Sequence, residues 1–482
     1  MKILYVSPEI TPFAKTGGLA DVAHALPKAI SALGHDVRTI MPKYLSIAEQ
    51  HLIMDRTASF TVQMHNGLHG AVLRQTENDG VPTYFVENDA YFNREGYYGL
   101  GDWNYPDNLE RFVFFCKAAL EVCKAVGFAP DVIHCNDWQT APLAAILKAT
   151  YAGYRKDPFF SPLPKLVYVI HNISYQGRFP EDHWPILALP RSYYGHDFEF
   201  YNQINLTKSA VHLSDATITV SQTYAREIQT TDLGFGLQDV LQARKENLYG
   251  ILNGVDYQQW NPETDPYTYG IHYSADDLSG KRQIKSKLRE EYGLPDRGEV
   301  PLIGMTTRFV EQKGIDLITA CAEQILKLDT HMLVLGSGEP RYHDFFEGLR
   351  RRYPERVGIY LGFNNELAHR IEAGADIFLM PSLFEPCGLN QIYSLKYGTL
   401  PIVRLTGGLA DTIEEGVNGF TFLDFTAAYF FDAVQRAIDL YRNQPDRWRQ
   451  MMMLAMAQDF SWDKSAEKYL AVYRNILPKN GS

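Results

Sequence analysis

Short apolar runs alternate with amphipathic stretches along the first half of this 482-residue chain. Runs of four to six apolar residues predict buried strands, and apolar positions spaced three and four apart predict helices. The expected strands are Ile3–Val6, Asp36–Met41, Thr83–Glu87, Val132–Cys135, Leu166–Ile170 and Ala216–Val220. The expected helices are Ala20–Leu33, closed by Gly34, then Leu109–Val126 and Ala141–Thr150. Alternation of strand and helix predicts a mostly parallel, doubly wound sheet.

The alternation breaks around residues 250–280, where a polar, proline-bearing and tyrosine-rich segment predicts an inter-domain connection. It then resumes, and the chain closes with an amphipathic, aromatic-rich helix at Ser461–Leu477. The expected strands of this second half are Pro301–Thr306, Met332–Leu335, Val357–Leu361, Ile377–Met380 and Pro401–Val403. We therefore expect domains at 1–255 and 256–460, followed by a terminal helix at 461–482.

Composition narrows the class of protein. A chain of 482 residues favours two domains, and 45% apolar with 21% charged residues is typical of a globular protein. The net charge of −11 comes without a basic run, which argues against nucleic acid and membrane surfaces as partners. Five cysteines form no disulfide framework and no zinc pattern. With an initial apolar run too short for a signal peptide, we expect a cytoplasmic protein.

The hexapeptide Thr-Gly-Gly-Leu-Ala-Asp occurs twice, at 16–21 and at 406–411. Each copy follows an apolar run and precedes a segment with helical spacing, which predicts a strand, a glycine turn and a helix. Paired glycines let the backbone approach a ligand closely, and the N–H groups at a helix start attract an anion. Lys15 and Asp21 flank the first pair; each taken alone is more often a surface charge. Together with the glycines they favour a site for a phosphorylated ligand.

In open parallel sheets, ligands bind at the carboxyl ends of the strands. In the second half, Arg308 and Lys313 follow one strand and suit a diphosphate, although a solvated charged loop is an equally good interpretation. Glu385 follows another strand, where it is either a helix-dipole partner or a ligand for sugar hydroxyls. Cys387 reads as a small buried residue, since no base lies close to it in sequence.

Polar and aromatic residues also follow strands of the first half. His171 and Asn172 come directly after Leu166–Ile170, and Asp137 with Trp138 follow Val132–Cys135. An acid beside a tryptophan suits a sugar ring, while a buried core tryptophan is about as common. Tyr98 adds aromatic surface in a glycine-rich loop. By contrast, Gly336-Ser337-Gly338 does not extend to a dinucleotide motif, because position 341 is Arg341.

Taken together, these segments resemble the bacterial glycogen synthases and plant starch synthases, the ADP-glucose-dependent glucan synthases of glycosyltransferase family 5, over nearly the whole chain. The resemblance is carried by the motifs Lys15–Leu19, Asn136–Trp138, His171-Asn172 with Tyr175–Gly177, Asn253–Asp256, Arg308–Gly314, Phe384–Leu389 and Arg404–Asp411. It implies a GT-B fold, in which two Rossmann-like domains face each other across a cleft and the terminal helix crosses back to the first domain.

The resemblance also implies an activity, the retaining transfer of glucose from ADP-glucose to the non-reducing 4-hydroxyl of an α-1,4-glucan. It implies no cofactor and no metal. The implied catalytic residues are His171, Arg308, Lys313 and Glu385. The implied donor-binding residues are Lys15, Gly17, Gly18, Asp21, Asn253, Phe363, Cys387, Gly388, Leu389, Thr406, Gly407 and Gly408. The implied acceptor-binding residues are Tyr98, Asp137, Trp138 and Asn172.

Three positions depart from the family pattern. Phe363 stands where relatives often carry a tyrosine against the adenine, and Glu95 replaces a usual proline in the acceptor loop. Leu405 stands before the second Thr-Gly-Gly, where arginine or serine is common. The alternatives are a GT-B enzyme that uses UDP-glucose to make a small sugar such as sucrose or trehalose phosphate, and a catalytically silent glucan-binding protein. An NAD-dependent oxidoreductase is a distant third.

Overall fold

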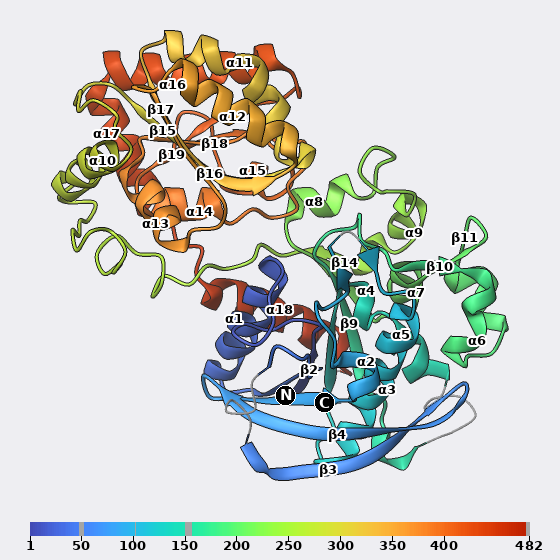
Figure 1. Cartoon of the computed structure of the whole chain (residues 1–482). Coiled ribbons are helices and arrows are strands. Elements are labelled where there is room, and N and C mark those ends of the chain that lie inside the picture. The colour runs from blue at the N-terminus through green and yellow to red at the C-terminus, as the bar shows by residue number, and fades with distance from the viewer. Residues whose placement is uncertain (48–52, 102, 150–156, 479–482) are drawn as a thin grey trace. The chain divides into compact units, whose positions relative to one another are not determined.

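The computed structural model describes residues 1–47, 53–101, 103–149 and 157–478. The chain forms two compact units, each built around its own sheet (Figure 1). The first unit comprises Met1–Val220, Ala225–Gly254 and Trp462–Ser482, and the second comprises Ser221–Tyr224 and Val255–Ser461. The parallel α/β class expected from the alternating pattern is confirmed in both units.

The first unit has a nine-stranded sheet in the order β14-β13-β9-β8-β1-β2-β5-β4-β3. All neighbouring pairs are parallel except β3 with β4 and β4 with β5. Its strands are β1 (Lys2–Val6), β2 (Asp36–Pro42), β3 (Ile53–Met64), β4 (Gly67–Asn78), β5 (Val81–Glu87), β8 (Val132–Asn136), β9 (Lys165–Ile170), β13 (Ala216–Thr219) and β14 (Leu248–Gly250). Because strands are added on one side of β1 and then on the other, the winding reverses between β1 and β8.

The helices of the first unit connect these strands. The longer ones are α1 (Gly18–Ala32), α3 (Asn108–Ala125), α7 (Leu206–Leu213) and α18 (Trp462–Ile476). The shorter ones are α2 (Asp89–Phe92), α4 (Asp137–Thr140), α5 (Pro142–Ile146), α6 (Trp184–Leu187) and α9 (Gln238–Ala243). Helix α8 (Gln222–Glu227) lies where the two units divide. Smaller strands β6 (Gly99–Leu100) and β7 (Trp103–Asn104) pair with each other. Strand β12 (Gln203–Asn205) pairs with both β10 (Arg178–Pro180) and β11 (Glu199–Phe200).

The long β3–β4 hairpin, drawn as an arch in Figure 1, was not predicted. The two-residue turn His65-Asn66 joins β3 to β4. Buried and exposed side chains alternate along the end of β3, where Val62 and Met64 are buried. Such alternation marks an antiparallel hairpin with one solvated face. The expected helix at Ala141–Thr150 forms as α5, which residues 147–149 continue as a π-helical turn; Thr150 itself lies outside the described residues.

The second unit has a six-stranded parallel sheet in the order β17-β16-β15-β18-β19-β20. Its strands are β15 (Leu302–Phe309), β16 (His331–Gly338), β17 (Val357–Leu361), β18 (Ile377–Met380), β19 (Leu400–Arg404) and β20 (Phe420–Phe422). Its helices are α10 (Ser279–Glu291), α11 (Ile315–Lys327), α12 (Pro340–Arg352), α13 (Asn365–Gly374), α14 (Asn390–Lys396), α15 (Gly407–Thr412), α16 (Ala427–Asn443) and α17 (Pro445–Met456). The winding reverses between β15 and β18.

Both faces of this second sheet are covered, as Figure 1 shows. Along β16, Met332 and Val334 belong to the core cluster on one face, whereas Leu333 and Leu335 belong to the cluster on the other. Since side chains alternate across a strand, a continuous apolar run fits only a strand buried on both sides. The five strands predicted for this half all form, and β20 adds a sixth at the edge.

Helix α18 returns to the first unit, where it packs against α1. The buried Tyr473 hydroxyl lies 2.6 Å from His134 Nδ1 on β8. Burial lowers the pKa of His134 to about 3, so the imidazole is neutral, and its Nδ1 is hydrogen-bonded to this hydroxyl. The last helix of the chain is therefore anchored in the core of its first unit.

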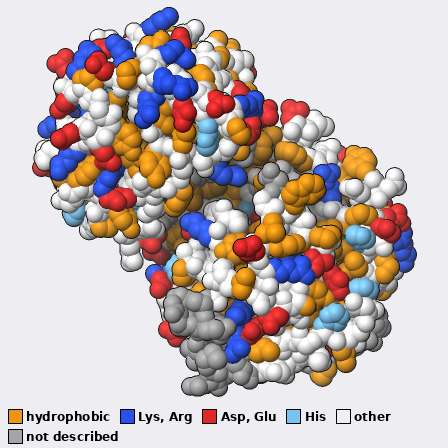
Figure 2. Space-filling model, in the orientation of Figure 1, with side chains coloured by type: hydrophobic (Ala, Val, Ile, Leu, Met, Phe, Trp, Pro, Cys, Tyr) orange, Lys and Arg blue, Asp and Glu red, His pale blue; other side chains and the backbone are white. Residues whose placement is uncertain are grey.

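The surface carries acidic and basic side chains interspersed over the face shown in Figure 2. Among the described residues, no helix is both long and apolar enough to span a bilayer.

Candidate active site

The loops after β15 and β18 bring together the predicted cation and carboxylate of the second unit. Lys313 Nζ lies 2.6 Å from Glu385 Oε2, and the Ser382 hydroxyl donates to the same oxygen at 3.0 Å. Glu385 is 5% exposed, so its charge is largely desolvated and is balanced by the ammonium group. This pair sits where the winding of the sheet reverses, which is the position at which open parallel sheets bind ligands.

A cavity of about 200 Å³ opens beside this ion pair. The buried Thr306 hydroxyl lines it and makes no hydrogen bond to any described residue. An unpaired polar atom in a cavity wall is a group that a ligand can satisfy. The lining comprises Thr306, Thr307, Lys313, Leu379, Met380, Ser382, Glu385, Gly388, Leu389 and Asn390. Predicted donor residues Gly388 and Leu389 therefore belong to this cavity, whereas Cys387 is buried behind it at 6% exposure.

Two predicted donor contacts extend outward from the same sheet edge. Arg308, at the end of β15, is exposed, and its guanidinium has no ion pair with any described carboxylate. Phe363 follows β17 and is 89% exposed, an unusual state for a large apolar side chain. A free guanidinium and an exposed flat ring are the groups that would contact a diphosphate and an aromatic base.

The second glycine pair is packed against the Glu385 loop. A Cβ added to Gly407 would lie 1.9 Å from the Glu385 carbonyl oxygen, and one added to Gly408 would lie 2.0 Å from that of Cys387. The Gly408 N–H donates to the Glu385 carbonyl at 3.0 Å. In this conformation Gly408 therefore holds the carboxylate loop in place and does not offer its N–H to an anion. Thr406 precedes the pair as the residue before α15 and is buried.

The first glycine pair is arranged differently although its sequence is identical. A Cβ added to Gly17 or Gly18 would meet no atom within 4 Å, so these glycines face open space at the start of α1. Lys15 Nζ and Asp21 Oδ1 lie 2.8 Å apart in front of this turn, and both side chains are well exposed. The first copy thus leaves room for a ligand where the second copy is filled by protein.

Glu9, which the sequence analysis did not single out, fixes the first glycine turn. Its buried carboxylate accepts hydrogen bonds from the Thr16 N–H at 2.5 Å and the Thr16 hydroxyl at 2.7 Å. It also accepts the Tyr98 hydroxyl at 2.5 Å. One carboxylate therefore couples the predicted donor turn to the predicted acceptor tyrosine. The available signal was its place directly after the central strand β1, where ligand-side residues gather.

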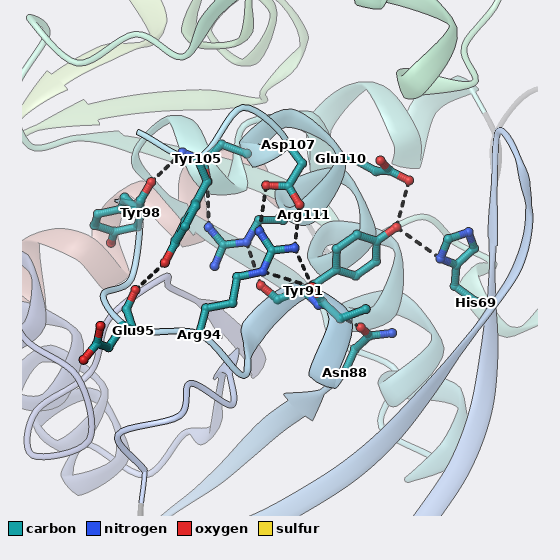
Figure 3. Close-up of polar contacts among 12 residues, drawn as sticks. His69, Asn88, Tyr91, Arg94, Glu95, Tyr98, Tyr105, Asp107, Glu110 and Arg111 are labelled. Carbon is teal, nitrogen blue, oxygen red and sulfur yellow. Dashed lines mark hydrogen bonds and ion pairs between the residues drawn. The ribbon is translucent and has the colours of Figure 1, made fainter. Parts of the chain in front are cut away.

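The loop that carries Tyr98 is clamped by an ion pair (Figure 3). The Arg94 guanidinium donates to both carboxylate oxygens of Asp107, at 2.9 and 2.7 Å. The Tyr98 carbonyl accepts from the Tyr105 N–H and from the Asn108 side chain, and the Tyr105 hydroxyl donates to the Glu95 carbonyl. Glu95, which stands where the family pattern has a proline, contributes only its backbone carbonyl here. The neighbouring Arg94–Asp107 ion pair maintains the shape of the loop.

His171 and Asp137 meet at the carboxyl ends of β9 and β8. Asp137 Oδ1 accepts the His171 N–H at 2.8 Å, and His171 Nε2 lies 2.9 Å from Asn136 Oδ1. Asn136 Nδ2 donates to the Val6 carbonyl, which fixes Oδ1 as the acceptor and places the histidine proton on Nε2. Desolvation lowers the pKa of His171 to about 3, leaving a neutral imidazole with an unprotonated Nδ1.

Asp137 itself is held in an unfavourable state. Desolvation, with the charge of Glu9 adding to it, raises the pKa of Asp137 to about 7 against the lowering effect of the His171 N–H. The residue also has φ of 54°, in the left-handed region that few non-glycine residues occupy. Strain and a perturbed carboxyl on one residue are features of functional sites.

The remaining predicted residues are less distinctive. Trp138 is half-buried and packs against Phe112 and Phe179, so much of its ring is part of the core. The side-chain Oδ1 of Asn172 caps its own loop by accepting from the Ser174 N–H and hydroxyl. Asn253 is 6% exposed, and its Oδ1 makes no hydrogen bond to a described residue, as expected of an atom awaiting a ligand.

The two glycine pairs should respond oppositely to alanine. We expect Gly408→Ala to lower the free energy of unfolding by about 1–3 kcal/mol, because the added Cβ would overlap the Cys387 carbonyl. Gly18→Ala places its Cβ in open space and within a helix, and should leave the melting temperature unchanged or slightly raised. Calorimetric melting of both variants checks this, and equal melting temperatures would contradict the packing described.

Asp137→Asn should stabilise the protein in a pH-dependent way. The pKa of Asp137 is about 7 in the folded protein and about 4 in the unfolded chain. Between these two pH values the folded protein holds a proton on Asp137 that the unfolded chain has lost. The free energy of unfolding therefore falls as the pH rises from about 4 to about 7. The amide keeps Oδ1 but carries no charge. We expect the gain in unfolding free energy to be larger at pH 8 than at pH 4.5 by about 1–3 kcal/mol in urea titrations. A gain independent of pH would show that Asp137 is not desolvated.

Comparison with known proteins agrees with this geometry. Residues 2–243 match the starch synthase catalytic domain family, and residues 286–451 match glycosyl transferases group 1. The glycogen synthase of Desulforudis audaxviator is 44% identical over 99% of this chain and 97% of its own. That of Geotalea daltonii is 42% identical over the full length of both chains.

Solved structures give the same result. The catalytic domain of starch synthase IV from Arabidopsis thaliana, bound to ADP and acarbose, superimposes with a TM-score of 0.88 at 32% identity, covering 99% of each chain. Sucrose-phosphate synthase from Thermosynechococcus elongatus shares the fold, with a TM-score of 0.61 at 17% identity over 98% of each chain. The predicted GT-B fold is confirmed, and the chain belongs to the glycogen and starch synthase family of glycosyltransferases.

Proposed function

We infer that this protein is a retaining glucosyltransferase that moves glucose from ADP-glucose to the non-reducing 4-hydroxyl of an α-1,4-glucan. The observation that carries the inference is the Lys313–Glu385 pair beside a cavity at the reversal of the second sheet, with Arg308 unpaired at the same edge. Family membership supports the substrates, since the relatives are glycogen synthases and the starch synthase structure holds ADP.

The chemistry calls for cations more than for a strong acid. ADP is already a stable anion, so expelling it requires stabilisation of the charge that grows on the diphosphate. We propose that Arg308 supplies a planar, unpaired guanidinium and that Lys313 supplies a point charge. Glu385, freed from full pairing when Lys313 turns to the diphosphate, would accept hydrogen bonds from hydroxyls of the donor glucose. On this proposal two protein cations do the work of a metal, and no metal is required.

The first unit would serve the acceptor and the anomeric carbon. A glucosyl transition state carries positive charge, which a protonated imidazole would repel. His171 is held neutral by desolvation and is oriented by the Asn136 contact, so it can lie near that carbon without opposing the charge. Asp137, Trp138, Asn172 and Tyr98 are the proposed acceptor contacts. Lys15, Asp21 and the open Gly17-Gly18 turn are the proposed donor contacts of this unit.

The alternatives are less well supported. A silent glucan-binding protein has no use for a lysine desolvated against a buried glutamate beside a cavity. A dinucleotide enzyme would need the Gly338 N–H, which instead donates to His343 Nε2 at 3.0 Å. All five cysteines are buried and free, which supports a reducing compartment such as the cytoplasm.

The test of this function is a donor competition on the full chain. The purified protein is incubated with glycogen and either ADP-glucose or UDP-glucose, and nucleotide release and α-1,4 extension are measured together. We expect extension with ADP-glucose at a kcat/KM at least about tenfold above that with UDP-glucose. A preference for UDP-glucose favours the related transferase that makes a small sugar, and release without extension excludes the glucan acceptor.

Removal of either cation should slow turnover strongly. We expect Arg308→Ala and Lys313→Ala each to lower kcat by about 100-fold or more, the cost of losing one electrostatic stabiliser of the transition state. Exposed residues of the same unit give matched controls, and Arg350→Ala and Lys327→Ala should retain nearly full activity. Unchanged kcat in both active-site variants would contradict the assigned roles.

A further inference from the structure

Two histidines and an aspartate converge on the surface of the first unit, in a part of the chain that the proposed reaction does not use. His196 and Asp197 lie on the π-helical turn η5 (Tyr194–Phe198), and His212 lies in the last turn of α7. His196 Nδ1 is 2.9 Å from Asp197 Oδ1, His212 Nδ1 is 3.3 Å from the same oxygen, and the two Nδ1 atoms are 3.1 Å apart.

Hydrogen bonds alone cannot satisfy this triangle. If both imidazoles carry their proton on Nδ1 and donate to Asp197, the two N–H groups oppose each other at 3.1 Å. If one Nδ1 is unprotonated and accepts from the other, its lone pair then faces the lone pairs of the carboxylate. With Asp197 ionised, one of the three contacts is therefore repulsive in each of these arrangements. A cation placed between the three atoms removes the conflict.

We propose that His196, Asp197 and His212 bind a divalent transition-metal ion, with Zn²⁺ as the best match. Zinc holds imidazole nitrogen and carboxylate oxygen at about 2.0–2.2 Å in tetrahedral geometry, so ligand atoms around it lie roughly 3.3–3.6 Å apart. The observed separations are 2.9, 3.1 and 3.3 Å, so the three atoms need to move apart by no more than about 0.4 Å to hold the ion. Two imidazoles and one carboxylate are borderline ligands that suit zinc and its neighbours better than Ca²⁺ or Mg²⁺.

The fold presents these three side chains on a rigid base. Strands β11 and β12 pair in antiparallel register between η5 and α7, through a tight turn in which Tyr201 and Asn202 have φ of 50° and 60°. Phe198, the neighbour of Asp197, is fully buried against Trp184. The nearby Lys208 ammonium points elsewhere, donating to the Glu199 carbonyl at 2.7 Å.

The exposures of the ligands fit an ion bound at the surface. The side chains of Asp197 and His212 are each 14% exposed, whereas that of His196 is 80% exposed and closes the site from the solvent side.

The consequence of binding would be structural. The ion would clip η5 to the C-terminal turn of α7. The N-terminal end of the same helix is capped by Asn205, which donates to Gln176 in the loop after His171. The proposed metal ion therefore holds the C-terminal end of α7, and the N-terminal end of the same helix supports the predicted active-site loop. It is independent of the proposed transfer reaction.

The test is Zn²⁺ binding by the tag-free, chelator-treated full-length protein. Isothermal titration calorimetry should give one Zn²⁺ per chain, and Zn²⁺ should raise the melting temperature. His196→Ala, chosen because this residue is exposed and its loss should not impair folding, should weaken binding at least about tenfold and abolish the thermal shift. Asp197→Asn should behave in the same way. Co²⁺ in place of Zn²⁺ should give absorption without thiolate charge transfer.

The matched control is His272→Ala, which removes an exposed histidine from the second unit and should bind Zn²⁺ as the unaltered chain does. Equal affinity in the unaltered protein, His196→Ala and Asp197→Asn overturns the proposal, as does the absence of binding at 100 μM Zn²⁺. A thiolate signature in the Co²⁺ spectrum also overturns it, because it assigns the ion to a cysteine.

Discussion

The parallel pairing of β15 with β18 is the constraint on which the second unit and its site depend. Ile303 pairs with Ile377 and Gly304 with Phe378, although more than seventy residues separate them in the chain. Because the winding reverses there, the loops that follow these strands lead to opposite faces of the sheet and leave space between them. Lys313 and Glu385 meet across that space at 2.6 Å. Without the pairing of β15 with β18, Lys313 and Glu385 would not be brought within reach of each other.

The two identical hexapeptides show how context assigns a role to a turn. In the second unit, the carbonyl oxygens of Glu385 and Cys387 occupy the places where side chains of Gly407 and Gly408 would be, so glycine is required for protein packing. In the first unit, the corresponding glycines face open space, and the carboxylate of Glu9 holds the turn from behind. Glycine is required in one case by a neighbouring loop, and in the other it leaves open space at the turn where we propose that the donor binds.

At one end of its sheet, the first unit buries ionisable side chains whose removal from water is energetically unfavourable. Glu9 and Asp137 are carboxyls removed from water, and His171 is an imidazole held neutral by desolvation. Such groups destabilise a folded protein and are found most often at functional sites. The Arg94–Asp107 clamp, the Tyr98 loop and the buried partners of Asn136 maintain this arrangement. The proposed metal clip at His196, Asp197 and His212 would stabilise the unit elsewhere, from its surface.

The sequence by itself determined the α/β class, the core strands and four of the ten residues that line the cavity of the second unit, because apolar periodicity and strand-end position are local properties. It also predicted Lys313 and Glu385 as candidates, but not that they form an ion pair. The coupling of Thr16 to Tyr98 through Glu9, and the triangle of His196, Asp197 and His212, were decided only by the tertiary structure. Each depends on hydrogen bonds or packing between side chains whose proximity is set by strand pairing and helix packing, and no local pattern encodes that proximity.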